Sequence, residues 1–183
     1  MGRVQADVAS RHQKRQGSAV TFVIRPLRAD EPALYREIRL EALRLHPEAF
    51  GSSFEDEAAR PLAFFEQRLT GNKIFGGFRG LELLGTAGFM PESGAKRVHK
   101  GHLWGMYVRP EARGSGLARR LVEAVLEHAQ YQVELIQLSV VLGNVAAHRL
   151  YLSLGFEPYG IEARSLKLEG RYLDEVHMVR MLA

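Results

Sequence analysis

The segment with the clearest chemical potential lies between Val108 and Ala118, where a predicted strand runs through a glycine-containing loop into a predicted helix. The first turn of a helix has unpaired backbone N–H groups and the positive end of the helix dipole, so anionic oxygens are favoured there. Gly114 and Gly116 remove side chains that would block close approach to the backbone. The segment predicts a site for a phosphate-like anion, although a glycine-rich helix start that binds nothing has the same pattern.

Two known phosphate loops can be excluded from the residue types. A P-loop needs Gly-Lys-Ser/Thr, and this loop contains no lysine. A dinucleotide fingerprint needs a third small residue where Arg119 stands, and it follows the first strand of a domain rather than a late one. Neither motif describes the loop.

A second segment follows the next predicted strand and reads Asn-Val-Ala-Ala-His-Arg-Leu-Tyr-Leu-Ser-Leu-Gly-Phe from Asn144 to Phe156. Together with Arg113-x-x-Gly116-x-Ala118, it resembles the GNAT superfamily of N-acetyltransferases. In that family the loop Gln/Arg-x-x-Gly-x-Gly/Ala holds the pyrophosphate of acetyl-CoA. The Asn, followed at seven residues by Tyr and then by Leu-Gly-Phe, marks the far side of the cofactor cleft. The resemblance implies a GNAT fold and acetyl-CoA as cosubstrate.

The resemblance also implies roles for single residues. In the family, the strand before the loop splays from its neighbour, so backbone groups of Met106, Tyr107 and Val108 are expected to hold the pantetheine and the acetyl carbonyl. Met106 and Val108 are equally compatible with sheet core. Tyr151 matches the tyrosine that protonates the CoA thiolate, and it also continues the apolar face of its helix. Asn144 is expected to contact the cofactor and is a good helix N-cap. The implied cofactor-binding set is completed by Arg113, Gly114, Ser115, Gly116, Leu117, Ala118 and Arg149.

The general base is where this sequence departs from the better-known subfamilies. Ribosomal-protein N-terminal acetyltransferases have a Glu on the strand before the Asn motif, and the matching Ser139 cannot serve as that base. Histone acetyltransferases have a Glu six residues before the valine that precedes the loop, and the matching residue is His102. A histidine titrates near neutral pH and could accept a proton directly or through water, although His102 also fits a strand position without a role. Weaker candidates are His99, Glu55 and Glu57, and water could replace a dedicated base.

The acceptor pocket has no chemical code in the sequence. It is expected from the helices between Asp30 and Leu69 and from the Pro91–Lys100 loop. Trp104 shares strand parity with His102 and Met106, so it is expected on their face, either as a wall of this pocket or as packing. Arginine pairs well with phosphate oxygens such as those of CoA. The arginines near the two motifs are Arg113, Arg119, Arg120 and Arg149.

Elements predicted from hydrophobic pattern and breaker residues must position these groups. Strands are predicted at Val20–Leu27, Lys73–Phe78, Leu81–Met90, His99–Val108, Glu134–Val141, Phe156–Leu168 and Arg171–Leu182. Helices are predicted from an Asp30 cap to Leu45, from Pro61 to Leu69 after a capping-box pair at Ser52 and Glu55, over Leu117–Gln130 and over Asn144–Leu154. The order β-α-α-β-β-β-α-β-α-β-β has hairpin-linked strands early and helix-linked strands late. It predicts a mixed α/β domain with a central twisted sheet and helices on both faces.

Composition sets the broad class. A chain of 183 residues, 46% hydrophobic and 25% charged, suits one compact domain and excludes a disordered or collagen-like protein. No apolar run approaches the roughly 20 residues that cross a bilayer, and the start lacks the apolar stretch of a secretory signal. With no cysteine, there is no disulfide framework, thiolate metal site or Cys nucleophile, and the histidine spacing predicts no metal. A cytoplasmic location is expected.

The formal charge of +4 is concentrated at the start of the chain. Residues 1–19 hold four basic residues against one acidic residue, which predicts a solvated, mobile basic tail before a GNAT domain over residues 20–183. Nucleic-acid binding by this tail is not supported by interleaved aromatic residues.

The sequence therefore predicts an N-acetyltransferase that moves an acetyl group from acetyl-CoA to a primary amine in a ternary complex. The missing Glu at Ser139 favours a small-molecule acceptor over a protein N-terminus or lysine. A GNAT-like module that binds CoA without catalysis is an alternative of another class. The sequence is compatible with a homodimer and does not specify the acceptor.

Overall fold

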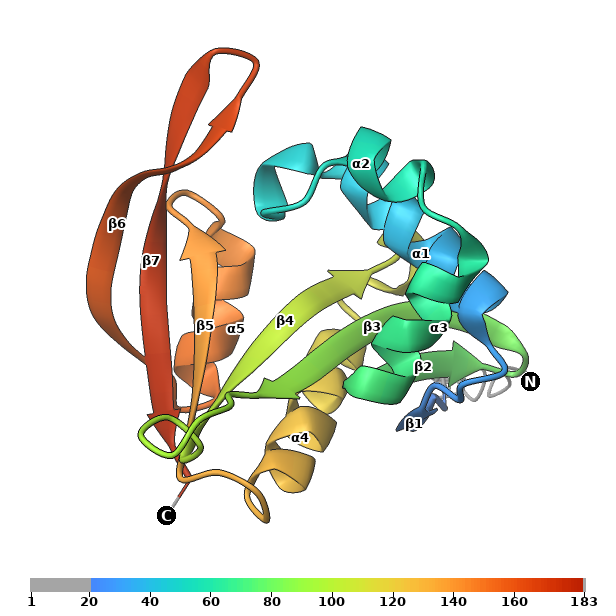
Figure 1. The fold of residues 1–183 in the computed structure, drawn as a ribbon, viewed down its shortest axis with the longest axis horizontal. Coiled ribbons are helices and arrows are strands. Elements are labelled where there is room, and N and C mark those ends of the chain that lie inside the picture. The colour runs from blue at the N-terminus through green and yellow to red at the C-terminus, as the bar shows by residue number, and fades with distance from the viewer. Residues whose placement is uncertain (1–20, 183) are drawn as a thin grey trace, which may run out of the picture.

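The computed structural model describes residues 21–182, and the predicted tail over residues 1–19 lies outside this range. Within it, a single sheet has helices on both faces (Figure 1). The strands are β1 (Val23–Pro26), β2 (Lys73–Arg79), β3 (Glu82–Pro91), β4 (Lys100–Val108), β5 (Leu135–Val141), β6 (Glu157–Leu168) and β7 (Arg171–Met181). The α-helices are α1 (Pro32–Leu45), α2 (Phe54–Ala58), α3 (Leu62–Gly71), α4 (Leu117–Ala129) and α5 (Val145–Ser153), with 3-10 helices η1 (Pro47–Ala49) and η2 (Pro110–Ala112).

The seven strands lie in the order β1-β2-β3-β4-β5-β7-β6. All neighbouring strands are antiparallel except β4 and β5, which are parallel. One core cluster lies between the sheet and helices α4 and α5, and a second lies between the sheet and helices α1 and α3. The predicted mixed sheet with helices on both faces is confirmed.

Helix α4 is anchored by the apolar stripe that its sequence predicts. Leu117, Leu121, Val125 and Ala129 each have 0% of their surface exposed. Because burying one large aliphatic side chain contributes roughly 1.5–3 kcal/mol, this stripe holds α4 firmly against the sheet. The loop at the start of α4 is fixed in place with it.

The start of helix α1 differs from the prediction. Asp30 does not cap it: the N-cap position is Glu31, and no side chain caps the helix. Asp30 instead pairs with Arg28 at 3.0 Å. The Glu31 carboxylate accepts hydrogen bonds from the Arg28 backbone N–H and from Arg25, which leaves it no role at the helix N–H groups.

The short helix α2 adds one helix to the predicted order. Its cap is Ser53 rather than Ser52, because the Ser53 hydroxyl accepts a hydrogen bond from the backbone N–H of Asp56 at 3.1 Å. Pro61 then takes the N-cap position of α3 with extended backbone. A proline favours extended backbone in the residue before it, so α2 and α3 are separate helices.

Strand β4 contains a bulge that changes which way its side chains face. Between Trp104 and Tyr107 it has one residue more than β3, and Gly105 there has φ +61°. One extra residue reverses side-chain parity. Trp104 therefore packs against the α1–α3 cluster, whereas Met106 packs against the α4–α5 cluster. The prediction that these two side chains share a face is wrong.

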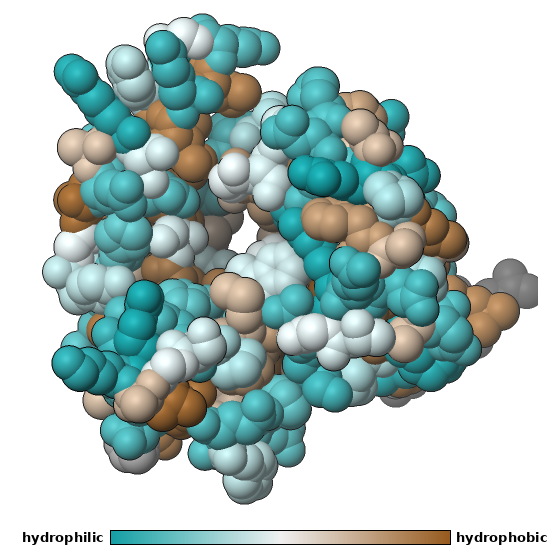
Figure 2. Space-filling model, viewed as in Figure 1, coloured by the Kyte–Doolittle hydropathy of each residue, from teal (hydrophilic) through white to brown (hydrophobic). Residues whose placement is uncertain are grey.

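Strands β4 and β5 separate soon after they meet. They pair only where Lys100–His102 lie beside Leu135–Gln137, and the remaining residues of both strands diverge. The strand before the glycine loop is therefore splayed from its neighbour, as predicted. Figure 2 shows the surface hollowed between the β5–β7 half of the molecule and the half that carries the helices α1–α3. We call this gap the β4–β5 opening.

Candidate active site

The glycine loop at the start of α4 presents a run of unpaired backbone donors. Gly114 and Gly116 have φ of +72° and +86°, a left-handed conformation that glycine adopts without strain. Within residues 21–182, no hydrogen bond is made by the backbone N–H groups of Gly114, Ser115, Gly116, Ala118 or Arg119. Five free donors at the positive end of a 13-residue helix form a site suited to an anion such as pyrophosphate.

Three side chains of the loop are already engaged in contacts within the protein. The Arg113 Nε donates to the Val108 carbonyl at 3.1 Å, and its Nη2 lies 2.7 Å from His46 Nε2. The Ser115 hydroxyl donates to a carbonyl of η2. The Leu117 side chain is fully buried in the core. Ser115 and Leu117 could therefore contact a ligand only through the backbone unless the loop rearranges.

The end of β4 is tied to helix α1 by a polar network. The Tyr107 hydroxyl donates to Glu41 at 2.9 Å, and Arg109 pairs with both Glu41 and Glu37 at 2.8 Å. Burial, together with the hydrogen bond to Glu41, raises the pKa of Tyr107 to about 12. The side chains of Tyr107 and Val108 are both buried, so only their backbone groups remain for a ligand.

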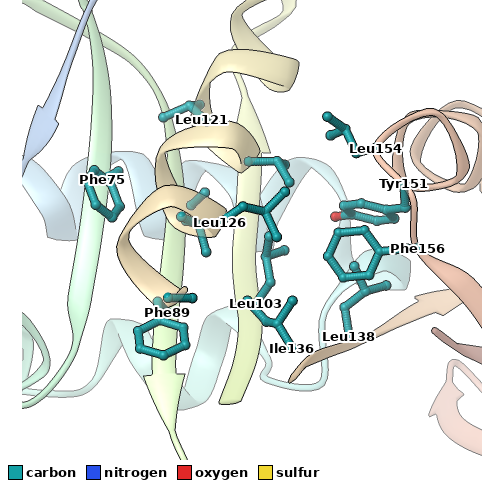
Figure 3. Packing of buried hydrophobic residues seen from close by; sticks show 14 of the residues in the cluster. Phe75, Phe89, Leu103, Leu121, Leu126, Ile136, Leu138, Tyr151, Leu154 and Phe156 are labelled. Carbon is teal, nitrogen blue, oxygen red and sulfur yellow. The ribbon is translucent and has the colours of Figure 1, made fainter. Parts of the chain in front are cut away.

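Tyr151 projects from α5 toward the sheet. Its ring is 5% exposed and packs edge-on against Phe156 with centroids 5.7 Å apart. In Figure 3 its hydroxyl points away from α5 toward α4 and β4. The hydroxyl has no hydrogen-bond partner among the described residues, and it is not fully enclosed either. Burial raises the pKa of Tyr151, so the phenol stays protonated across the physiological range.

The second motif places one cap and one free cation near the opening. The Asn144 side chain accepts a hydrogen bond at 3.2 Å from the third residue of α5, so the predicted capping role is confirmed. Arg149 is exposed and has no ion pair within the described part of the chain. Arg119 bridges α4 to α5 by donating to the Ser153 hydroxyl at 2.7 Å. Arg120 instead lines a groove between α4, β1 and β2.

His102 occupies the last residue of β4 that pairs with β5. Its Nε2 lies 2.9 Å from Glu92, whose carboxylate also pairs with Arg97. The hydrogen bond from His102 and the charge of Arg97 lower the pKa of Glu92. His102 is thus oriented by a carboxylate at the closed end of the opening.

The weaker base candidates separate clearly. Glu57 is buried between Arg39, at 2.8 Å, and Arg68, at 3.1 Å. Burial acts to raise the pKa of Glu57, but these two arginines outweigh it and hold the pKa below its ordinary value. The Glu57 carboxylate is held in two buried ion pairs, so it is not available as a general base. Glu55 is exposed on α2. The backbone carbonyl of His99 accepts hydrogen bonds from the backbone N–H groups of Glu134 and Leu135 at the start of β5.

The two segments predicted to form the acceptor pocket lie far apart. Figure 1 shows α1 and α2 over the wide end of the β4–β5 opening, whereas the Pro91–Lys100 loop lies at its closed end. η1, which follows α1, contacts both β5 and β6. Of the two segments predicted to form the pocket, the α1–α2 region is therefore the one at the wide end (Figure 1).

Three polar residues from different strands also lie within hydrogen-bonding distance of one another. Ser139 on β5 lies beside His177 on β7, with 2.8 Å between the Ser139 Oγ and His177 Nδ1. His177 Nε2 lies 3.0 Å from a Glu162 carboxylate oxygen on β6. No sequence signal links these residues, because their proximity depends on β7 lying between β5 and β6.

The fold and the anion site match those of a known family of proteins. The model of the acetyltransferase (GNAT) family matches residues 36–156. The chain belongs to this family. Among the described residues, no helix is long and apolar enough to span a bilayer, and no three metal-ligating side chains cluster.

The chain is also similar to individual proteins in sequence and in structure. The chain is 35% identical over 74 residues to the L-methionine sulfoximine/L-methionine sulfone acetyltransferase of Pseudomonas aeruginosa, a match covering 40% of the chain and 43% of the relative. It superposes on a GNAT-family acetyltransferase of Streptococcus pneumoniae with a TM-score of 0.79 at 21% identity, covering 88% and 99% of the two chains. For yncA of Salmonella typhimurium, solved with its cofactor acetyl-CoA, the TM-score is 0.73 at 25% identity, covering 88% and 94%.

Proposed function

We propose that this acetyltransferase moves an acetyl group from acetyl-CoA to the primary amine of a small molecule, by direct transfer in a ternary complex. The observation that carries the proposal is the run of free backbone N–H groups between Gly114 and Arg119, on the loop that continues from β4 at the β4–β5 opening. A pyrophosphate is favoured by the start of α4, and a narrow pantetheine arm suits an opening lined by strand backbone. The Pseudomonas relative, by its name, acts on small amino-acid analogues.

The cofactor-binding set divides by the kind of group that each residue offers. Met106, Tyr107 and Val108 offer backbone groups on the splayed part of β4. Arg149 offers a free guanidinium to a phosphate, and Arg113 could turn from His46 to do so. The loop offers the free backbone N–H groups of Gly114, Ser115, Gly116 and Ala118, whereas the Leu117 N–H donates to the Ser115 hydroxyl at 3.4 Å and would have to leave it to reach a ligand. The second motif adds Asn144.

Acetyl transfer needs an amine nucleophile, a polarised carbonyl and a proton for the leaving sulfur. The amine nitrogen forms a bond to the thioester carbon, and the C–S electrons leave with the sulfur. We assign the proton for that sulfur to Tyr151, whose hydroxyl has no competing partner among residues 21–182. Burial raises the pKa of Tyr151, so this phenol is a weak acid. It therefore first donates a hydrogen bond to the sulfur, and it transfers its proton as negative charge develops on the sulfur. His102, oriented by Glu92, stays a candidate base.

The experiment is a turnover screen with the full chain. Acetyl-CoA is incubated with panels of amino acids, amino-acid analogues, polyamines and peptides, and free thiol and acetylated products are measured. Thiol release that depends on a small amine is the expected result. Release only with peptides would move the acceptor to a protein, and CoA binding without release would indicate a binding module. A cytoplasmic location and a homodimer stay predictions.

A further inference from the structure

A hydrogen-bonded chain of Ser139, His177 and Glu162 runs across three strands on the sheet face opposite α5. Its two links are 2.8 Å, from the Ser139 Oγ to His177 Nδ1, and 3.0 Å, from His177 Nε2 to Glu162. Tyr159 stacks on the His177 ring with centroids 5.8 Å apart and accepts a hydrogen bond from Gln137. The imidazole is therefore held on both nitrogens and on one ring face.

This chain begins at the β4–β5 opening. The last residue of β5 that pairs with β4 is Gln137, so Ser139 is the next residue on the same face and has no β4 neighbour. Leu138, between them, faces the core beneath Tyr151 and Phe156 (Figure 3). Tyr151 and Ser139 consequently approach the opening from opposite faces of the sheet. Such an arrangement separates a group that serves the leaving sulfur from one that serves the incoming amine.

The strand pairing places acidic side chains near His177. Glu162 contacts it directly, and Glu175, on the same face of β7, accepts a hydrogen bond from Ser165 at 2.6 Å. The facing residues of β5 carry no charge. Glu162 is thus placed to accept the Nε2–H of His177, which leaves Nδ1 to accept from the Ser139 hydroxyl.

We infer that Ser139 is the group that takes the proton from the acceptor amine, and that His177, oriented by Glu162, receives the Ser139 proton in turn. The inference rests on the proposed N-acetyltransferase function. As the nitrogen attacks the thioester, its proton passes to the Ser139 Oγ while the hydroxyl proton passes to His177 Nδ1. Nε2–H remains hydrogen-bonded to Glu162, the imidazolium releases its proton to water, and Tyr151 is reprotonated from water. A serine alone cannot act as a base, but a serine backed by an imidazole can relay a proton.

His102 is less well placed than Ser139 to take a proton from the amine. It lies at the last paired residue of β4, where its Nε2 is turned to Glu92 and the Pro91–Lys100 loop. Ser139 instead lies beyond the pairing, inside the opening. Both histidines are exposed enough that their hydrogen bonds contribute little to stability, with His102 side-chain exposure of 34% and His177 of 27%. Variants at either position are therefore expected to fold.

The test compares five variants of the full chain with the parent, using acetyl-CoA and an amine found in the turnover screen; the fifth is His102→Gln, which should keep the parent pH profile. Ser139→Ala and His177→Gln are each expected to lower kcat/KM by about 100-fold, the lower end of general base catalysis. His177→Gln should also change the shape of the pH profile of kcat/KM, because it removes the group that receives the proton. Ser139→Thr keeps a hydroxyl on a strand and should restore most of the activity. His128→Gln is the matched control, because His128 lies in the last turn of α4 beside Phe75. This variant should keep the parent's kcat/KM and its pH profile.

Four results would overturn the inference. They are parent-like activity of Ser139→Ala, a parent-like pH profile of His177→Gln, a changed pH profile of His102→Gln instead, and an acetylated Ser139 peptide after incubation with acetyl-CoA alone. The last result would make Ser139 a nucleophile instead of a relay. Failure of the underlying function looks different, because the parent itself would then release no thiol with any amine.

Discussion

Replacing Tyr151 by phenylalanine tests whether this residue is a proton donor or only a core aromatic. The substitution keeps the buried ring and its edge contact with Phe156 and removes a hydroxyl that has no partner among the described residues. Because no protein hydrogen bond is lost, the free energy of unfolding should change by less than about 1 kcal/mol. Tyr151→Ala would instead remove the ring and cost about 3–5 kcal/mol.

The effect on catalysis should be much larger. General acid catalysis contributes roughly 100- to 10,000-fold, and we expect about 100-fold here, or about 2.7 kcal/mol of transition-state free energy. The low end is expected because burial raises the pKa of Tyr151 and so weakens it as an acid. Water that enters the opening could also supply part of the proton transfer.

The assay separates chemistry from binding. Single-turnover measurements with saturating acetyl-CoA and acceptor give the rate of the chemical step, and calorimetry gives CoA affinity. Denaturant unfolding gives the stability of each variant. The phenylalanine variant should bind CoA like the parent, unfold like the parent and react about 100-fold more slowly.

A parent-like single-turnover rate for Tyr151→Phe would refute the assignment and leave Tyr151 as a core aromatic. A slow variant that has also lost several kcal/mol of stability would refute the structural reasoning, because it would show that the hydroxyl has a structural partner.

Three further predictions address other parts of the structure. Gly116→Asp should abolish measurable CoA binding in calorimetry, whereas Gly116→Ala, which meets the same left-handed backbone but open space, should keep most of it; equal affinities would contradict the anion site. Glu57→Gln should lower the urea-unfolding free energy by about 3–5 kcal/mol because it leaves Arg39 buried without a charged partner, whereas Glu82→Gln in an exposed pair should change it by less than about 1 kcal/mol. The hydrogen bond from arginine lowers the pKa of Glu31 to about 2 from 4.5, so the stability it contributes is present above pH 4.5 and lost as pH falls toward 2. The stability difference between the parent and Glu31→Gln should therefore shrink between pH 5 and 3, and a constant difference would contradict the lowered pKa.

The sequence by itself determined the features that depend on neighbours along the chain. The glycine loop and the start of α4 follow from Gly114, Gly116 and the apolar stripe behind them, all within one turn or one helix. The Asn144 cap and the turn at Glu169-Gly170, where both residues have positive φ, are equally local. Local geometry and amphipathic periodicity are encoded in adjacent residues, so the order of strands and most helices could be predicted.

Only the tertiary structure decided which distant side chains meet. The bulge at Gly105 turned Met106 away from Trp104, and nothing in strand parity signals where an extra residue will be accommodated. The pair of arginines around Glu57 comes from α1 and α3, and it removes a carboxylate that looks available in the sequence. Ser139 meets His177 because β7 inserts between β5 and β6, a pairing set by hydrogen bonds between residues 38 positions apart. The residues proposed to accept the proton of the amine come from three different strands, and the order of strands depends on the packing of the whole sheet.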